Sequence, residues 1–198
     1  MSDYFAEALW GVPVLAIVRG LKPASAVAAA EHCWRAGIPL VEVSLSGEHA
    51  MTALEAVCRR GRELGHAAGA GTVLTADQVA AATEAGAAFA VAPGLDPDTV
   101  AAAQGLDLPY LPGVATPSEV QNALALECRT LKLFPASALG TDWLRSLAGP
   151  FPEARFVAVG GVDVRNASAW MEAGAVGIGV GSALEEAALP ELVAAVAR

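Results

Sequence analysis

The sequence predicts an α/β fold made of repeated β/α units, and three observations support this prediction. Short apolar runs alternate with longer, Ala-rich amphipathic stretches. The apolar runs recur roughly every 20 to 26 residues, a spacing typical of a strand followed by a helix. Eight such repeats fit into the 198 residues of the chain. Eight repeats in one domain favour a closed (β/α)8 TIM barrel, and an open doubly wound sheet is the main alternative.

Each predicted strand is short, and each is followed by a segment of helical periodicity. In chain order the strands are PVLAIV (13–18), PLVEVS (39–44), HAAGA (66–70), AFAVA (88–92), PYLPG (109–113), RTLKLF (129–134), RFVAV (155–159) and VGIGV (176–180). Glycines that suit left-handed helix C-caps precede three strands, at Gly37, Gly86 and Gly174. Capping side chains precede the helices at Thr75, Asp96, Thr116 and Asp163.

The length of the chain predicts one domain, residues 1–198, in which residues 1–11 form a short extra helix that closes one end of the barrel. The net charge of −9 argues against nucleic acid and anionic membranes as partners. No apolar run approaches the roughly 18 residues that span a bilayer. The N-terminus MSDYFAEALWG begins acidic and lacks the order of a signal peptide. We therefore expect a cytoplasmic protein that acts on a small molecule.

Neither a metal nor a cofactor is expected. The three cysteines, Cys33, Cys58 and Cys128, are far apart and are best interpreted as free, buried thiols. No two histidines have the spacing of a ligand pair on a helix. The glycines of GIGVG are spaced G-x-G-x-G, and too few residues follow for the acidic group of a dinucleotide-binding fingerprint.

A lysine interrupts the sixth predicted strand. Leu131 and Leu133 share one face of this strand, so Thr130 and Lys132 share the other. Because the outward face of a barrel strand must meet the helices, the leucines point outward and Lys132 points into the barrel.

Other polar residues end the neighbouring strands. In PLVEVS the valines point outward, whereas Glu42 and Ser44 point inward. Arg19 ends the first strand, and Thr72 follows the third. Since functional groups in this fold gather at the carboxyl ends of strands, Glu42, Thr72, Lys132 and Arg19 are expected to converge on one rim.

Two interpretations of the buried lysine and glutamate stay open on pattern alone. A structural Lys132–Glu42 ion pair is one, although two buried charges seldom stabilise a fold better than apolar residues do. The other is chemical: an apolar pocket lowers the pKa of a lysine, whose neutral amine can attack a ketone and form a Schiff base. The iminium accepts the electrons released when a C–C bond breaks, and Glu42 could move the protons.

Glycine-rich turns follow the last two strands, VGGV (159–162) and GVGS (179–182). Turns at these positions in a barrel commonly bind phosphate through backbone N–H groups. Tight packing would explain the glycines equally well.

The chain resembles the 2-keto-3-deoxy-6-phosphogluconate (KDPG) aldolases and their relatives. The motifs that carry the resemblance run in the family's order from residue 16 to 184: AIVRG, VEVSL, GAGTVLT, AVAPGLD, YLPGVATPSE, LKLFPAS, AVGGV and IGVGSAL. The resemblance implies a homotrimer of barrels that act as class I aldolases without a metal. It also implies reversible cleavage of a phosphorylated 2-keto-3-deoxy acid to pyruvate and glyceraldehyde 3-phosphate.

The same resemblance implies a role for each matching residue. Lys132, in LKLFPA, would carry the Schiff base, and Glu42 would be the acid/base group. Thr72 of GAGT would help to hold the pyruvyl carboxylate. Pro93 and Phe134 would line the pocket. The phosphate would be bound by Gly160, Gly161, Gly181 and Ser182.

Two positions depart from the family pattern. Some members place a carboxylate-binding arginine where this chain has Ser46, so we assign that contact to Arg19, which other members use instead. Many gluconate-type enzymes have threonine where this chain has Val159, and galactonate-type relatives have valine. Val159 therefore favours the galactonate-type substrate, or tolerance of both C4 epimers.

Three alternative functions remain. The nearest is an aldolase of unphosphorylated 4-hydroxy-2-oxoglutarate, which gives pyruvate and glyoxylate. A barrel isomerase or synthase of phosphorylated metabolites would share the glycine-rich loops but would not need Lys132. A non-catalytic barrel that binds a phosphate ligand is the third, and the presence of both Lys132 and Glu42 argues against it.

Overall fold

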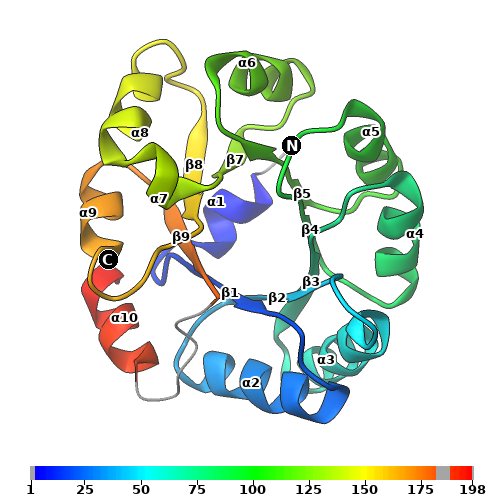
Figure 1. The fold of residues 1–198 in the computed structure, drawn as a ribbon. Helices are drawn as coiled ribbons and strands as arrows, with labels where there is room; N and C mark the ends of the chain where they lie inside the picture. The colour runs from blue at the N-terminus through cyan, green and yellow to red at the C-terminus, as the bar shows by residue number, and fades with distance from the viewer. Residues whose placement is uncertain (1–2, 182–187, 198) are drawn as a thin grey trace.

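The computed structural model describes residues 3–181 and 188–197. Nine parallel strands form one sheet that is rolled into a nearly closed barrel surrounded by helices (Figure 1). The strands are β1 (Val14–Val18), β2 (Leu40–Ser44), β3 (Ala67–Gly71), β4 (Ala90–Val91), β5 (Tyr110–Leu111), β6 (Gly113–Val114), β7 (Thr130–Leu133), β8 (Arg155–Val159) and β9 (Gly177–Val180). The helices are α1 (Tyr4–Ala8), α2 (Pro23–Arg35), α3 (Ala50–Leu64), α4 (Ala76–Glu84), α5 (Pro97–Gly105), α6 (Pro117–Ala125), α7 (Ala136–Leu139), α8 (Thr141–Ala148), α9 (Ala167–Glu172) and α10 (Leu189–Val196).

The sheet order β5-β4-β3-β2-β1-β9-β8-β7-β6 confirms the strand succession and excludes a doubly wound sheet. Its two edge strands, β5 and β6, are the halves of the single strand predicted for residues 109–113. Pro112 separates them because proline has no N–H for a strand ladder. The Pro112 carbonyl nevertheless accepts a hydrogen bond of 2.8 Å from the Lys132 N–H. The two edges of the sheet therefore meet within one short segment of chain.

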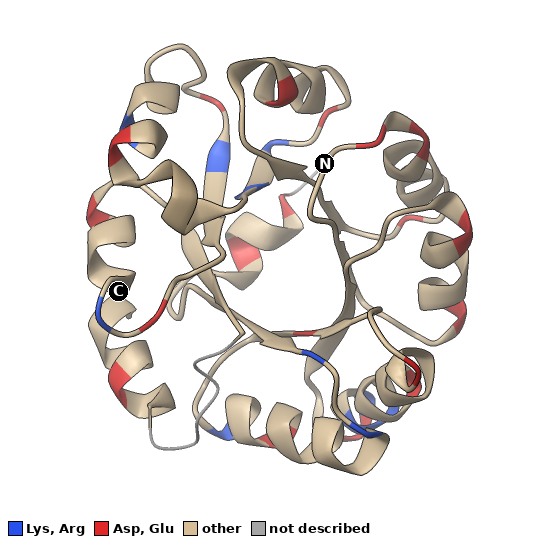
Figure 2. Ribbon diagram, in the orientation of Figure 1, with Lys and Arg blue, Asp and Glu red and all other residues tan. Residues whose placement is uncertain are grey.

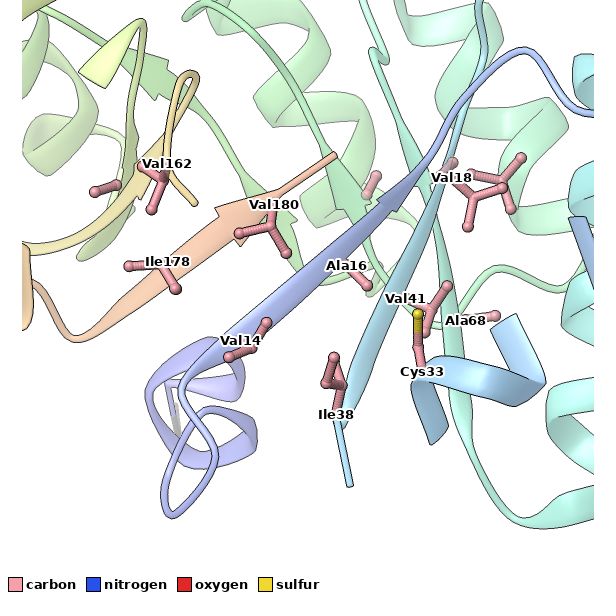
Figure 3. Packing of buried hydrophobic residues seen from close by; sticks show 14 of the residues in the cluster. Val14, Ala16, Val18, Cys33, Ile38, Val41, Ala68, Val162, Ile178 and Val180 are labelled. Atoms are coloured by element: carbon pink, nitrogen blue, oxygen red, sulfur yellow. The ribbon is translucent and has the colours of Figure 1, made fainter. Parts of the chain in front are cut away.

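The alternation of side chains along the strands produces two separate apolar clusters. The outer cluster lies between sheet and helices and includes Val41, Val43, Leu131 and Leu133. Figure 3 shows part of it, with Cys33 of α2 directed toward the strands. The inner cluster fills the barrel and includes Leu15, Ile17, Leu40, Val157 and Val159. The predicted directions of the second and sixth strands are thus confirmed, with the valines and leucines outside.

The short helix α1 lies in the middle of the ring of strands in Figure 1. It is shorter than the helix expected over residues 1–11. Phe5 and Leu9 belong to the inner cluster. Asp3 caps α1 and accepts hydrogen bonds from Oγ1 of Thr130 and from Arg155, at 2.7 and 3.1 Å. Because Thr130 and Arg155 begin strands, α1 lies at the amino-terminal end of the barrel.

Most predicted helix ends are confirmed. Thr75, Asp96 and Thr116 accept N-cap hydrogen bonds, and Thr116 forms a capping box with Glu119. The C-cap glycines Gly37, Gly86 and Gly174 have positive φ angles. The prediction for Asp163 was wrong. Its carboxylate instead accepts from the backbone N–H and side chain of Arg165, and the helix begins later, at Ala167.

The charged residues are concentrated on the outer helices and loops, as the colours in Figure 2 show. Two buried charged residues in the described ranges, Glu42 and Lys132, are therefore exceptions. None of the described helices is both long and apolar enough to cross a membrane.

Candidate active site

Glu42 lies on β2 inside the barrel, and its residue is only 1% exposed. Its register neighbours are Ile17 on β1 and Gly69 on β3. The carboxyl group leans over Gly71, where an added Cβ would lie 2.5 Å from Oε1. Gly71 of the GAGT segment thus leaves the space that the glutamate side chain occupies. A larger residue at Gly71 would force the carboxyl group to move.

Lys132 lies on β7 and is 4% exposed. Its register neighbours are Gly113 on β6 and Val157 on β8. Val157 belongs to the inner cluster, so the lysine stem runs along apolar surface. Nζ lies 5.1 Å from the centroid of the Phe134 ring, within the range of a cation–π contact. The amine is therefore held inside the barrel, as the alternation of side chains predicts.

Burial changes the acidity of both groups. It raises the pKa of Glu42 to about 7, against the opposing effects of the positive charges of Lys132 and Arg19. Burial also lowers the pKa of Lys132; Arg19 lowers it further, whereas the charge of Glu42 raises it. The three residues therefore lie within electrostatic range of one another. Each shift moves the group toward the neutral form, which is the form that a nucleophilic amine needs.

A close ion pair between the two is not observed in the described part of the chain. Every ion pair within 4.0 Å there joins an Arg to an Asp or Glu near the surface. Oε2 of Glu42 is buried without a hydrogen-bond partner among the described residues. A structural ion pair would satisfy both groups, so that interpretation loses its support. A buried carboxyl group without a hydrogen-bond partner lowers the stability of the fold, and such groups cluster at functional sites.

Thr72, which follows β3, adopts a left-handed backbone conformation with φ 60°. This conformation is strained for a β-branched residue and occurs mainly where the surroundings impose it. Its Oγ1 lies 2.8 Å from Oγ of Ser44, which lies 3.0 Å from Oγ of Ser46. Sequence reasoning placed Ser44 inside the barrel but missed this chain of hydroxyl groups. The available signal was that Ser44 lies two residues after Glu42 and therefore on the same face of β2.

Of the other predicted pocket residues, Phe134 contacts the lysine directly. The carbonyl of Pro93 closely approaches Gly113, the register neighbour of Lys132. The Phe134 ring approaches Gly160, where an added Cβ would lie 3.1 Å from the ring. Val159 belongs to the inner cluster on β8. Phe134 thus connects the lysine with the first glycine-rich loop.

The two glycine-rich loops lie at the carboxyl ends of β8 and β9. Gly160 and Gly161 both have positive φ angles, 97° and 74°. The Gly160 carbonyl accepts from the Ser137 N–H, and the Gly161 carbonyl accepts from the Asn166 side chain, each at 2.9 Å. Gly181 directly follows β9 and is the last described residue before position 182, so the predicted Ser182 lies outside the described residues.

A parallel barrel that holds a desolvated lysine beside a glutamate is the architecture of an imine-forming aldolase. Residues 6–195 match the family model for the KDPG and KHG aldolases, and the chain belongs to this family. Members of the family are lyases.

Two curated relatives come from Escherichia coli strain K12. The KHG/KDPG aldolase is 37% identical over 155 residues, which cover 78% of this chain and 72% of the relative. The 2-dehydro-3-deoxy-6-phosphogalactonate aldolase is 34% identical over 179 residues, covering 89% and 86%.

A solved structure of KDPG aldolase from Legionella pneumophila, with pyruvate captured as a covalent carbinolamine, superposes with a TM-score of 0.82. The two sequences are 28% identical, and the match covers 96% of this chain and 95% of the Legionella chain.

Proposed function

We propose that this protein is a class I aldolase that cleaves a 2-keto-3-deoxy-6-phospho sugar acid reversibly to pyruvate and glyceraldehyde 3-phosphate. The observation that carries the proposal is the Lys132 amine, buried inside the barrel without an ion pair among the described residues. A free lysine at pH 7 is neutral in only a few of roughly ten thousand molecules. The lowered pKa of Lys132 makes the reactive form more abundant.

In the proposed reaction, the neutral Nζ of Lys132 attacks the C2 ketone and gives a carbinolamine, which loses water to form an iminium. Glu42, as a carboxylate, removes the proton of the C4 hydroxyl while the C3–C4 bond breaks. The bond electrons pass into the iminium and form an enamine, and the aldehyde leaves. Protonation at C3 and hydrolysis then release pyruvate. A pKa of about 7 suits Glu42 to both taking and returning a proton at neutral pH.

The ends of the substrate would be bound separately. Arg19 and Thr72 are proposed to hold the pyruvyl carboxylate, since both extend from strand ends beside Glu42. Gly160, Gly161, Gly181 and Ser182 are proposed to bind the 6-phosphate. Pro93 and Phe134 would close the sides of the pocket. The covalent carbinolamine in the Legionella relative supports this assignment of chemistry.

The preferred C4 epimer is proposed to be the galactonate type, or both. Val159 offers a methyl group where a threonine would offer a hydroxyl donor. The curated relatives include enzymes named for the phosphogluconate and for the phosphogalactonate.

Aldol cleavage of unphosphorylated 4-hydroxy-2-oxoglutarate is the second candidate function. The family model and the E. coli relative both carry KHG in their names. In that case the glycine-rich loops would have no phosphate to bind, and rates with and without the 6-phosphate would be similar.

The wider properties of the protein are also proposals. We propose a single domain over residues 1–198 that needs no metal or cofactor, assembles as a homotrimer and works in the cytoplasm. The three cysteines are free thiols, and burial raises the pKa of Cys33 and Cys58 to about 11, which suits a reducing compartment.

Borohydride reduction in the presence of pyruvate tests the central proposal. Mass spectrometry should find one reduced pyruvyl group, on the peptide that contains Lys132. Only one other lysine, Lys22, exists in the chain, so the assignment is direct. Lys132→Met, which keeps the length of the side chain, should abolish the adduct, and Lys22→Arg is the matched control. An adduct that persists in Lys132→Met would overturn the proposal.

A further inference from the structure

The hydroxyl groups of Ser46, Ser44 and Thr72 form a continuous chain at the carboxyl end of β2. The two links are 3.0 Å, between Ser46 and Ser44, and 2.8 Å, between Ser44 and Thr72. The middle member, Ser44, is 1% exposed, whereas Ser46 is exposed at the surface. The chain therefore runs from solvent to the residue that we propose binds the substrate carboxylate.

The backbone holds this chain in place. Ser44 is the last residue of β2 and pairs in register with Gly71. The next N–H, that of Leu45, donates to the Gly71 carbonyl at 2.7 Å. Thr72 follows directly in its left-handed conformation. The end of β2 is thus joined to the strained turn twice, by the Leu45 backbone hydrogen bond and by the side-chain hydrogen bond of Ser44.

The direction of hydrogen bonding along the chain has two possible senses, because each hydroxyl has one hydrogen to donate. In one sense Ser46 donates to Ser44, Ser44 donates to Thr72, and the hydrogen of Thr72 remains for the ligand. In the other sense Thr72 donates to Ser44 and turns a lone pair toward the ligand. A carboxylate accepts hydrogen bonds only, so it requires the first sense.

We infer that Ser44 is a positioning residue that directs the Thr72 hydroxyl toward the carboxylate of the keto acid, with Ser46 as the outer donor of the chain. The inference rests on the proposed function, in which Thr72 contacts that carboxylate. Consecutive hydrogen bonds that point the same way polarise one another, so the terminal donor is stronger than an isolated hydroxyl. The chain thereby gives a site without an arginine at residue 46 additional donor strength toward an anion.

A pocket beside the chain relates it to the other proposed carboxylate ligand. Ser44 and Ser46 line this pocket together with Gly20, which directly follows Arg19. The end of the first strand and two members of the hydroxyl chain, Ser44 and Ser46, thus border one pocket, although neither Arg19 nor Thr72 lines it.

The test compares the trapping of pyruvate by borohydride with the trapping of acetone, a ketone that lacks the carboxylate. Ser44→Ala should raise the half-saturating pyruvate concentration by about 3- to 10-fold, the cost of one lost hydrogen bond. Its rate of acetone trapping should match that of the wild type, which also shows that the variant is folded. Ser44→Thr, which keeps the hydroxyl, should restore pyruvate trapping, and Ser25→Ala on the exposed face of α2 is the matched control.

A double-mutant cycle with Thr72→Val separates positioning from general destabilisation. If Ser44 acts through Thr72, Ser44→Ala should add almost nothing in the Thr72→Val background. An equal fold-change in both backgrounds, or an equal loss of acetone trapping, would overturn the inference. If Thr72→Val alone leaves pyruvate trapping unchanged, the carboxylate role of Thr72 is wrong and the inference is wrong with it. The Lys132 adduct would still stand in that case, so the aldolase proposal is tested independently.

Discussion

The two ends of the barrel use the same strand in opposite ways. At the amino-terminal end of β7, Thr130 donates to Asp3, a carboxylate that also caps α1 and binds Arg155. About 7 Å further along the same face, Lys132 has only the Phe134 ring as a close partner among the described residues. At the first end Thr130, Asp3 and Arg155 satisfy one another, whereas the second end keeps a buried amine and a buried carboxyl without an ion pair. We call the amino-terminal end, with Asp3 and Thr130, the closed end, and the carboxyl-terminal end, with Glu42 and Lys132, the open end. The closed end stabilises the fold, whereas the open end keeps the buried, unpaired groups that the chemistry needs.

Replacing Glu42, at the open end, should have the largest effect on catalysis of all the changes considered. Glu42→Gln keeps the shape but removes the proton carrier, so we expect kcat to fall by about 10²- to 10⁴-fold while pyruvate still binds. Steady-state kinetics of cleavage would measure the fall. Glu48→Gln, on the adjacent exposed loop, is the control. Turnover near the wild-type rate would remove the acid/base role of Glu42.

The complementary change at the closed end should reduce stability instead. Phe5 is buried in the inner cluster and packs edge-on against Phe89, with ring centroids 5.7 Å apart. Phe5→Ala should lower the free energy of unfolding by about 3 kcal/mol and change kcat less than tenfold. Urea unfolding and the cleavage assay would measure both quantities. Leu64→Ala, on the exposed end of α3, provides a control of similar chemistry. A fall in kcat of more than tenfold, in a variant that is still folded under the assay conditions, would show that the two ends are not independent.

The raised pKa of Glu42, at the open end, predicts that the stability of the protein depends on pH. Burial raises this pKa from 4.5 to about 7, so the folded protein holds the proton more tightly than the unfolded chain does. The resulting stabilisation is fully present below about pH 4.5 and is lost as the pH rises through about 7. Between pH 5 and 8 the wild type should therefore lose about 2 to 3 kcal/mol relative to Glu42→Gln. Denaturant unfolding of both proteins at the two pH values measures this difference, and a constant difference would contradict the prediction.

The smallest expected effect concerns substrate choice. Val159→Thr adds a hydroxyl with almost no change of shape and should raise the kcat/KM ratio of the gluconate to the galactonate epimer by about tenfold. Side-by-side kinetics on the two C4 epimers would measure this ratio. Val157→Thr, on the same face of β8 but deeper in the barrel, should leave the ratio unchanged. Equal ratios in all three proteins would remove Val159 from the specificity pocket.

Local sequence patterns were sufficient for most of the architecture. The positions of the strands follow from apolar runs of the right length, and the faces of β2 and β7 follow from alternation with period two. Two predictions failed because a residue has two possible local roles and the sequence pattern does not show which one it takes. Pro112 divides one predicted strand, and Asp163 binds Arg165 instead of capping a helix.

The sequence by itself determined the succession of β/α units, the inward direction of Glu42 and Lys132, and the motifs of the aldolase family, because each is encoded within one segment. Only the tertiary structure decided that the lysine and the glutamate are not joined by an ion pair and that three hydroxyl groups form a chain. Those features depend on distances between side chains of different strands. Strand register and barrel curvature set such distances, and both arise from the packing of the whole chain.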